Sequence, residues 1–144
     1  MALPLTPNKN RQLRRYTMKV AETPVEGGIA LVELASGTVV VAGADPALIA
    51  GFFATPDPAS MTFDPYPLDV MIWLAYPGST FWIEGTSAPV VGNIGNEYGI
   101  GVSAEVAIID IADTTNKRLV VEDIDTDWGL FEVSVLDANR QLGG

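Results

Sequence analysis

The sequence predicts an all-β fold, either a small β-barrel or a jelly-roll-like sandwich, with an extended N-terminal arm. Three observations predict it. From Met18 onward, apolar residues occur in short runs rich in β-branched side chains, and several runs alternate with polar residues. Fourteen glycines and ten prolines divide these runs and disfavour long helices. The 144 residues suit one core, so we expect one β-rich domain at 18–144 and an arm at 1–17.

The arm is predicted because its residues lack the periodic pattern of a strand or a helix. Residues 1–17 contain Pro4, Pro7 and two asparagines, and they show no sustained period of either 2 or 3.6. Such a segment has too little apolar surface to offset the entropy lost when it is ordered alone. We therefore expect an extended chain here.

Eight later segments are expected to form strands. In order they are 29–34, 38–42, 47–54, 69–76, 80–85, 103–112, 117–123 and 129–137. In the last segment, alternation predicts that Phe131, Val133 and Val135 face inward while Glu132 and Ser134 face outward.

The segment 103–112 has a less polar second face. Its alternation predicts that Val106 and Ile108 point inward, whereas Glu105, Ala107 and Ile109 point the other way. That second face is only partly polar, so this strand has weaker patterning than the last one.

Turn residues connect these segments. Ala35-Ser36-Gly37 predicts a tight hairpin, Pro77-Gly78 a turn, and Asp113 to Asn116 a polar loop. At 45–49, Asp45 is suited to cap a short helical turn with proline in the first position. The stretch GNIGNEYGIG, 92–101, has glycine spacings that fit neither a dinucleotide fingerprint nor a phosphate loop, and it is interpreted as a flexible loop.

The composition excludes many kinds of active site. The chain has neither Cys nor His, which removes the usual general base at neutral pH, the usual transition-metal ligands and every Ser-His or Cys-His relay. Paired carboxylates can hydrolyse glycosides without His, but they need a cleft for which a small barrel has little room. We predict a protein that is not an enzyme and that carries no cofactor.

One acidic motif has the spacing of a calcium loop. Asp123, Asp125 and Asp127 alternate in EDIDTDWG, but an EF-hand requires Gly at its sixth position and Glu at its twelfth. Those positions hold Trp128 and Ser134. An EF-hand is excluded, and a looser calcium site is the alternative to one solvated face of a hairpin.

Charge is distributed unevenly along the chain. The formal net charge is −10, yet five of the eight basic residues lie in the first nineteen positions, which carry +5 and leave −15 on the remainder. These five residues are Lys9, Arg11, Arg14, Arg15 and Lys19. A nucleic-acid tail is one alternative, but the acidic body would repel a polyanion. We expect the arm to bind an acidic protein surface, on the next copy of the chain or on a shell to which the chain is attached.

The three tryptophans are expected to differ. Trp73 lies in an apolar run and is predicted to be in the core, Trp82 fits either the core or the surface, and Trp128 in a turn is the best candidate for an exposed anchor. A second hypothesis is a glycan- or host-surface-binding module of a virion, resting on Trp82, Trp128 and Tyr98.

Three stretches resemble the decoration, or cement, proteins of tailed-phage capsids. They are TPVEGGIALVELASGTVVVAGADPALIAGFFATP, VVGNIGNEYGIGV and RLVVEDIDTDWGLFEVSVLDANRQ, and together the similarity covers about 25–140. The resemblance is one of rhythm: a Gly-rich approach, a strand, a Ser-Gly turn, a second strand and later a closing hairpin. The Pro- and aromatic-rich stretch from Asp57 to Asp69 departs from the pattern.

The resemblance implies a structural role in the virion. Such proteins are β-rich and often trimeric, and they sit on the capsid exterior, where they bind the major capsid protein and sister subunits and often brace neighbours with N-terminal arms. Contact with neither nucleic acid nor a membrane is expected. On this basis the partner-binding residues are Lys9, Arg11, Arg14, Arg15, Tyr16, Lys19 and Trp128.

No segment of the sequence is suited to a membrane or to export. The longest uncharged run, Val70 to Ile83, has fourteen residues, whereas a spanning helix needs about twenty. The basic cluster is followed by Glu22 and Glu26 instead of the apolar stretch of a secretory signal. We expect a soluble protein made in the host cytoplasm and used without export.

Overall fold

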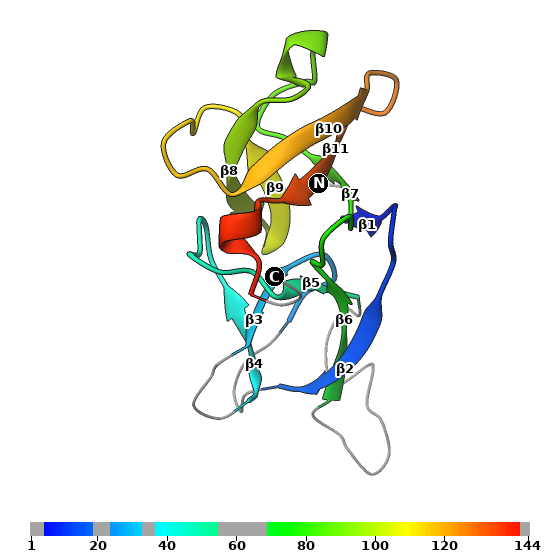
Figure 1. Ribbon diagram of the computed structural model, residues 1–144, viewed down its shortest axis with the longest axis vertical. Helices are drawn as coiled ribbons and strands as arrows, with labels where there is room; N and C mark the ends of the chain where they lie inside the picture. Colours follow the sequence, from blue (N-terminus) through cyan, green and yellow to red (C-terminus); the bar gives the residue numbers. More distant parts are fainter. Residues whose placement is uncertain (1–4, 19–23, 33–36, 55–68, 142–144) are drawn as a thin grey trace.

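The computed structural model describes residues 5–18, 24–32, 37–54 and 69–141, and these residues are nearly all β (Figure 1). The all-β prediction is therefore confirmed. The strands are β1 (Thr6–Pro7), β2 (Leu13–Thr17), β3 (Ile29–Val32), β4 (Val39–Ala42), β5 (Gly51–Phe53), β6 (Asp69–Leu74), β7 (Phe81–Glu84), β8 (Glu97–Ser103), β9 (Val106–Asp110), β10 (Leu119–Asp125) and β11 (Leu130–Val135). Two 3-10 turns, η1 (Val91–Asn93) and η2 (Asp137–Asn139), accompany them. Within the described ranges, no helix has the length and hydrophobicity that crossing a bilayer requires.

The strands form two antiparallel sheets. The six-stranded sheet has the order β1-β7-β11-β10-β8-β9, and the five-stranded sheet has the order β2-β6-β5-β3-β4. Each sheet curls toward closure, because Gly85 after β7 bridges Ile109 of β9, and Met18 after β2 bridges Val39 of β4. Figure 1 shows the two sheets stacked along the long axis, with β7 to β11 in the upper half and β2 to β6 in the lower half. The result is an arrangement of two sheets that is consistent with a barrel or sandwich.

Two clusters of buried hydrophobic residues form the core, and β5 contributes to both. Phe52 belongs to the cluster of the six-stranded sheet and Phe53 to that of the five-stranded sheet, because successive strand residues point to opposite faces. The ring of Phe52 meets that of Phe81 in β7 edge-on, with centroids 4.8 Å apart and planes at 66°. This aromatic pair packs the two sheets onto each other.

Each of the eight predicted strand segments contains a strand, although the bounds differ. Only 51–53 of the segment 47–54 is a strand, and the end of 29–34 lies outside the described residues. In β11, Phe131, Val133 and Val135 are buried as predicted. Glu132, predicted to face outward into solvent, is only 3% exposed. It lies on the outer face, but residues from elsewhere in the chain cover it, as described below.

The inward face predicted for β9 is wrong. Ala107 and Ile109 are in the core, while Ile108 is half-buried. Val106 is buried, as predicted. The cause is a tight turn at Ala104 and Glu105, which have φ of 48° and 67°. This turn ends β8 at Ser103 and sets the phase of β9 independently of the sequence pattern.

The predicted flexible loop at 92–101 is also wrong, because its second half is part of β8. Gly99 pairs with Asp110 of β9, and Tyr98 pairs with Leu119 of β10. A side chain at Gly99 would meet the carboxylates of Asp45 and Asp113. The glycine is therefore explained by a close approach within the sheet, and not by flexibility.

The connections are mostly as predicted. At Pro77-Gly78 the amide of Ser79 donates to Tyr76 over 3.0 Å, so the turn is confirmed, but it joins strands of different sheets. The polar loop at 113–116 is also confirmed. β3 and β4 pair as a hairpin, although Ala35 and Ser36 lie outside the described residues. The predicted helical turn at 45–49 is absent, and Ile49 instead bridges Arg140.

The N-terminal segment is extended, as predicted, but it does not reach away from the body. β1 pairs with β7 of one sheet, and β2 pairs with β6 of the other along all five of its residues. Leu5 and Met18, 3% and 2% exposed, are buried at its two ends. These two side chains and the ladder hydrogen bonds supply the stabilisation that the polar segment lacks by itself.

Candidate partner-binding surface

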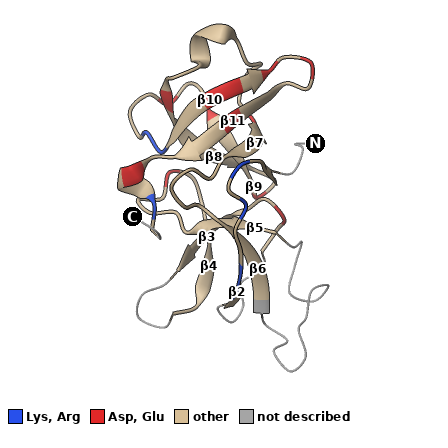
Figure 2. Cartoon of the chain, turned by 45° about the vertical axis from the view of Figure 1, so that its right-hand side comes forward, with Lys and Arg blue, Asp and Glu red and all other residues tan. Residues whose placement is uncertain are grey.

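Four of the five predicted basic residues form one exposed strip. The basic strip consists of Lys9, Arg11, Arg14 and Arg15, and it runs from the loop after β1 into β2 (Figure 2). All four residues are exposed. The fifth, Lys19, lies outside the described residues. The partner-binding role expected for these residues stays a prediction.

A buried carboxylate fixes the start of the strip to the six-stranded sheet. Glu132 Oε2 accepts hydrogen bonds from Asn8 Nδ2 over 2.6 Å and from Thr80 Oγ1 over 2.7 Å. The ammonium of Lys9 lies 3.8 Å from the same oxygen. A buried carboxylate with these partners is well satisfied. Glu132 thus holds the N-terminal segment in place from a position 124 residues away.

The strip then passes from one sheet to the other at Asn10. This residue has a φ of 49°, a conformation that asparagine tolerates better than most residues. Its side-chain amide donates to the carbonyl of Pro77 over 2.9 Å, and its carbonyl accepts from the hydroxyl of Ser79 over 3.0 Å. After it, the amide of Leu74 donates to Gln12 over 2.7 Å. The strip therefore spans both sheets as an ordered chain.

Two arginines of the strip have no carboxylate partner in the described part of the chain. Arg11 Nε donates to the carbonyl of Asn8 over 3.0 Å, and the Arg14 guanidinium lies over the ring of Tyr16, 5.1 Å from its centroid. Neither forms an ion pair with a described Asp or Glu. Between them Leu13 is 46% exposed. This exposed leucine is a feature of the surface that the charge pattern did not identify.

Tyr16 has a more internal place than predicted. It is half-buried and packs against the cluster of the five-stranded sheet. Burial raises the pKa of its hydroxyl, an effect that the positive charge of Arg14 opposes. Part of its ring is therefore already covered by this chain, and only the remainder is available to a partner.

The tip of the β10–β11 hairpin carries the most exposed tryptophan that the sequence singled out. Trp128 is 70% exposed. Asp125 Oδ1 accepts from the amides of Asp127 over 3.0 Å and Trp128 over 3.1 Å, which shapes the turn. The predicted exposure of Trp128 is confirmed, and its partner role stays a prediction. No group of three or more acidic residues in the described ranges is placed to hold a metal ion, so the looser calcium site at Asp123, Asp125 and Asp127 has no support.

The aromatic platform of the second hypothesis is not assembled. Tyr98 is 6% exposed and lies in the core, where its hydroxyl accepts from Asn93 Nδ2 over 3.0 Å. Trp82 is half-buried. Trp73, predicted to be core, is partly buried and packs against the cluster of the six-stranded sheet. Trp128 therefore remains without the two aromatic partners that a sugar-stacking surface was expected to have.

A pair of carboxylates lies where β8 is covered by two loops. Asp45 Oδ1 accepts from the amide of Ile100 over 2.8 Å, and Asp113 Oδ1 accepts from the amides of Thr115 and Asn116 over 3.0 and 2.9 Å. The amide of Asn116 is the main reason that the pKa of Asp113 falls to about 2, whereas burial raises the pKa of Asp45. Both carboxyl groups lie over Gly99. In the sequence, only the glycine at position 99 indicates that other groups approach β8 closely at this point.

An open hollow of about 700 Å³ lies on the outer face of the six-stranded sheet. Its lining combines the carboxylates of Glu97 and Glu122 with the cations of Lys9 and Arg140. Glu122 Oε1 accepts from the hydroxyl of Ser134 over 2.8 Å, and Arg140 forms an ion pair with Asp137. The charges along this hollow are therefore mixed in sign.

Comparisons with known proteins identify no relative. No protein-family model, curated protein or solved structure matches the chain.

Proposed function

We propose that this chain is a structural virion protein that binds the exterior of an assembled capsid shell and stabilises it. In this proposal the basic strip contacts an acidic surface of the major capsid protein or of a sister subunit, and Trp128 adds a second contact. The protein acts by binding and performs no catalysis. The resemblance in the sequence suggests this class of protein, and the geometry of the strip supports the binding role.

One observation carries the proposal. Arg11 and Arg14 are exposed and have no carboxylate partner among the described residues, yet they lie on a segment held by Glu132, by Asn10 and by the β2–β6 ladder. Presenting charged groups on an ordered segment reduces the entropy that binding must overcome. Guanidinium groups also form strong bidentate hydrogen bonds with carboxylates. The arrangement suits docking onto an acidic protein surface.

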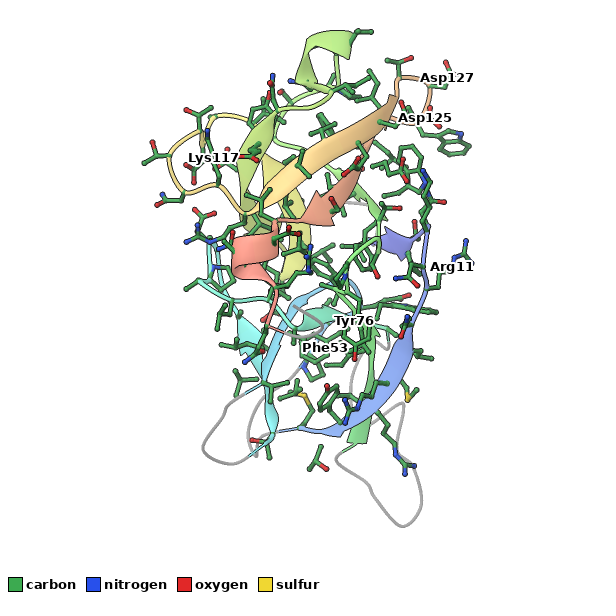
Figure 3. The ribbon with its side chains drawn as sticks, in the orientation of Figure 1. Arg11, Phe53, Tyr76, Lys117, Asp125 and Asp127 are labelled. Carbon is green, nitrogen blue, oxygen red and sulfur yellow. The ribbon has the colours of Figure 1, made fainter. Side chains whose placement is uncertain are left out.

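The test is co-sedimentation with undecorated capsid shells. Arg11→Glu and Arg14→Glu should each weaken binding at least about tenfold, which corresponds to about 1.4 kcal/mol. Lys117→Glu is the matched control, because Lys117 is exposed and lies on the opposite side of the molecule from Arg11 (Figure 3). Added salt should weaken the wild-type contact by screening it. Equal binding by the arginine variants and the wild type would refute the proposal.

Charge reversal is a better test than removal of residues 1–17. Such a deletion would take away β2, and it would leave Glu132 buried without Asn8. Loss of binding after the deletion could then reflect damage to the fold. The point variants keep the backbone ladder intact, so their effect reports on the charged surface alone.

A further inference from the structure

The hairpin tip has the opposite character to the basic strip. The tip surface consists of Asp123, Asp125, Asp127 and Trp128, all at the end of the β10–β11 hairpin. Figure 2 shows acidic residues along this hairpin in one half of the molecule, whereas the basic strip continues into β2 in the other half. The three carboxylates do not converge on a metal site. Asp123 and Asp127 are exposed, whereas Asp125 is half-buried and accepts hydrogen bonds from the turn amides.

The two surfaces are opposite in charge and similar in apolar content. In the strip, the half-exposed Leu13 lies between Arg11 and Arg14, and at the tip Trp128, 70% exposed, follows Asp127. Each surface thus combines one large apolar side chain with charges of a single sign. Apolar contact with a charged rim of opposite sign is typical of a specific protein interface.

We infer that the basic strip of one copy binds the tip surface of the next copy. The strip spans both sheets, the tip surface ends a hairpin of the six-stranded sheet, and in Figure 3 Arg11 lies well below Asp125 and Asp127. A contact between copies brings them together without refolding. Tip against tip, or strip against strip, would place like charges opposite each other and is disfavoured. The contact is therefore heterologous, from head to tail, and it repeats to form a ring or a row of subunits.

This inference deepens the proposed function, because it names the acidic partner of the strip as a sister subunit. It rests on that function only for its location on a shell, and it is tested with purified protein alone. In analytical ultracentrifugation, the full chain should sediment at low salt as species heavier than the 15.3 kDa monomer. The mass should grow with concentration, and it should fall toward the monomer at about 1 M salt, where the Debye length is about 3 Å.

Two double variants test the two surfaces separately. Arg11→Glu with Arg14→Glu removes the net positive charge of the strip, and Asp123→Lys with Asp127→Lys makes the tip net positive. Asp125 is left in place because it shapes the turn. Each double variant alone should associate at least about tenfold more weakly than the wild type. The control Glu26→Lys with Glu105→Lys reverses two exposed carboxylates elsewhere and should leave association unchanged.

Mixing the two double variants gives the decisive result. Alone, neither variant can pair a positive strip with a negative tip, but in an equimolar mixture the unaltered acidic tip of the first variant meets the unaltered basic strip of the second. The mixture should therefore regain the association that both variants lack. A wild type that stays at 15.3 kDa at all concentrations, or a mixture no heavier than its components, would overturn the inference. A monomer that still binds shells through Arg11 and Arg14 would leave the proposed function standing.

Discussion

Removing the hydroxyl of Thr80 should destabilise the protein, because it breaks the contact that fixes the N-terminal segment. Thr80 is 6% exposed and Glu132 3%. The Thr80 hydroxyl donates to Glu132 over 2.7 Å and accepts from the amide of Lys9 over 3.1 Å. Thr80→Val keeps the shape of the side chain but removes both hydrogen bonds. A hydrogen bond to a charged group contributes about 1.5–3 kcal/mol, so we expect a loss of about 2 kcal/mol in the free energy of unfolding.

Urea denaturation followed by tryptophan fluorescence measures this loss. With a slope of about 2 kcal/mol per molar urea, the transition midpoint of Thr80→Val should fall by about 1 M. Thr80→Ser keeps the hydroxyl and should lie closer to the wild type. Asn8→Ala should couple to Thr80→Val non-additively, because both side chains donate to Glu132 Oε2. Equal midpoints for the valine and serine variants would refute the role assigned to Glu132.

Two further predictions concern the strands and the acidic pair. Gly51→Ala should destabilise strongly, by about 3 kcal/mol, since its Cβ would overlap the carbonyl of Trp73. Gly43→Ala, with no atom within 4 Å of the added Cβ, is the neutral control, and equal melting temperatures would contradict the packing of β5 on β6. Asp113 has a folded pKa of about 2 against an ordinary 3.8, so its stabilising contribution is present above 3.8 and lost as the pH falls toward 2. The pKa of Asp45 is raised, so this residue acts in the opposite direction. Its contribution to stability is present below pH 3.8 and is lost as the pH rises through the pKa of Asp45 in the folded protein. Stability measured from pH 4 to pH 2 should therefore fall less in Asp113→Asn than in the wild type, and identical slopes would disprove the assignment.

The alternation of apolar and polar residues was sufficient to predict the core face of a strand where its two faces differ clearly in polarity. In β11 the alternation of Phe131, Val133 and Val135 identified the core face, and Pro77-Gly78 identified a turn, because these signals depend on neighbouring residues only. The pattern could not show that Glu132, on the other face, is covered by Asn8 and Thr80. Those contacts join residues 124 and 52 positions apart.

The errors in β8 and β9, and the order of the N-terminal segment, have causes that the polarity pattern of these segments does not show. Glycine in β8 suggested a loop, but Gly99 is required by side chains that lie over the strand. The phase of β9 is set by the turn at Ala104 and Glu105. The basic segment has too little apolar surface to fold alone, and its order comes from β6, β7 and the buried ends at Leu5 and Met18. Charge composition correctly marked the exposed cations, but it did not reveal that they are held on a sheet.

A density map of capsid shells mixed with the purified protein, compared with a map of the bare shells, tests the proposed function most directly. We expect additional density on the shell exterior, oriented so that the side chains of Arg11 and Arg14 contact carboxylates of a neighbouring protein. Shells that show no additional density, or bound copies whose β2 strand faces solvent without a neighbour, would contradict the proposed function.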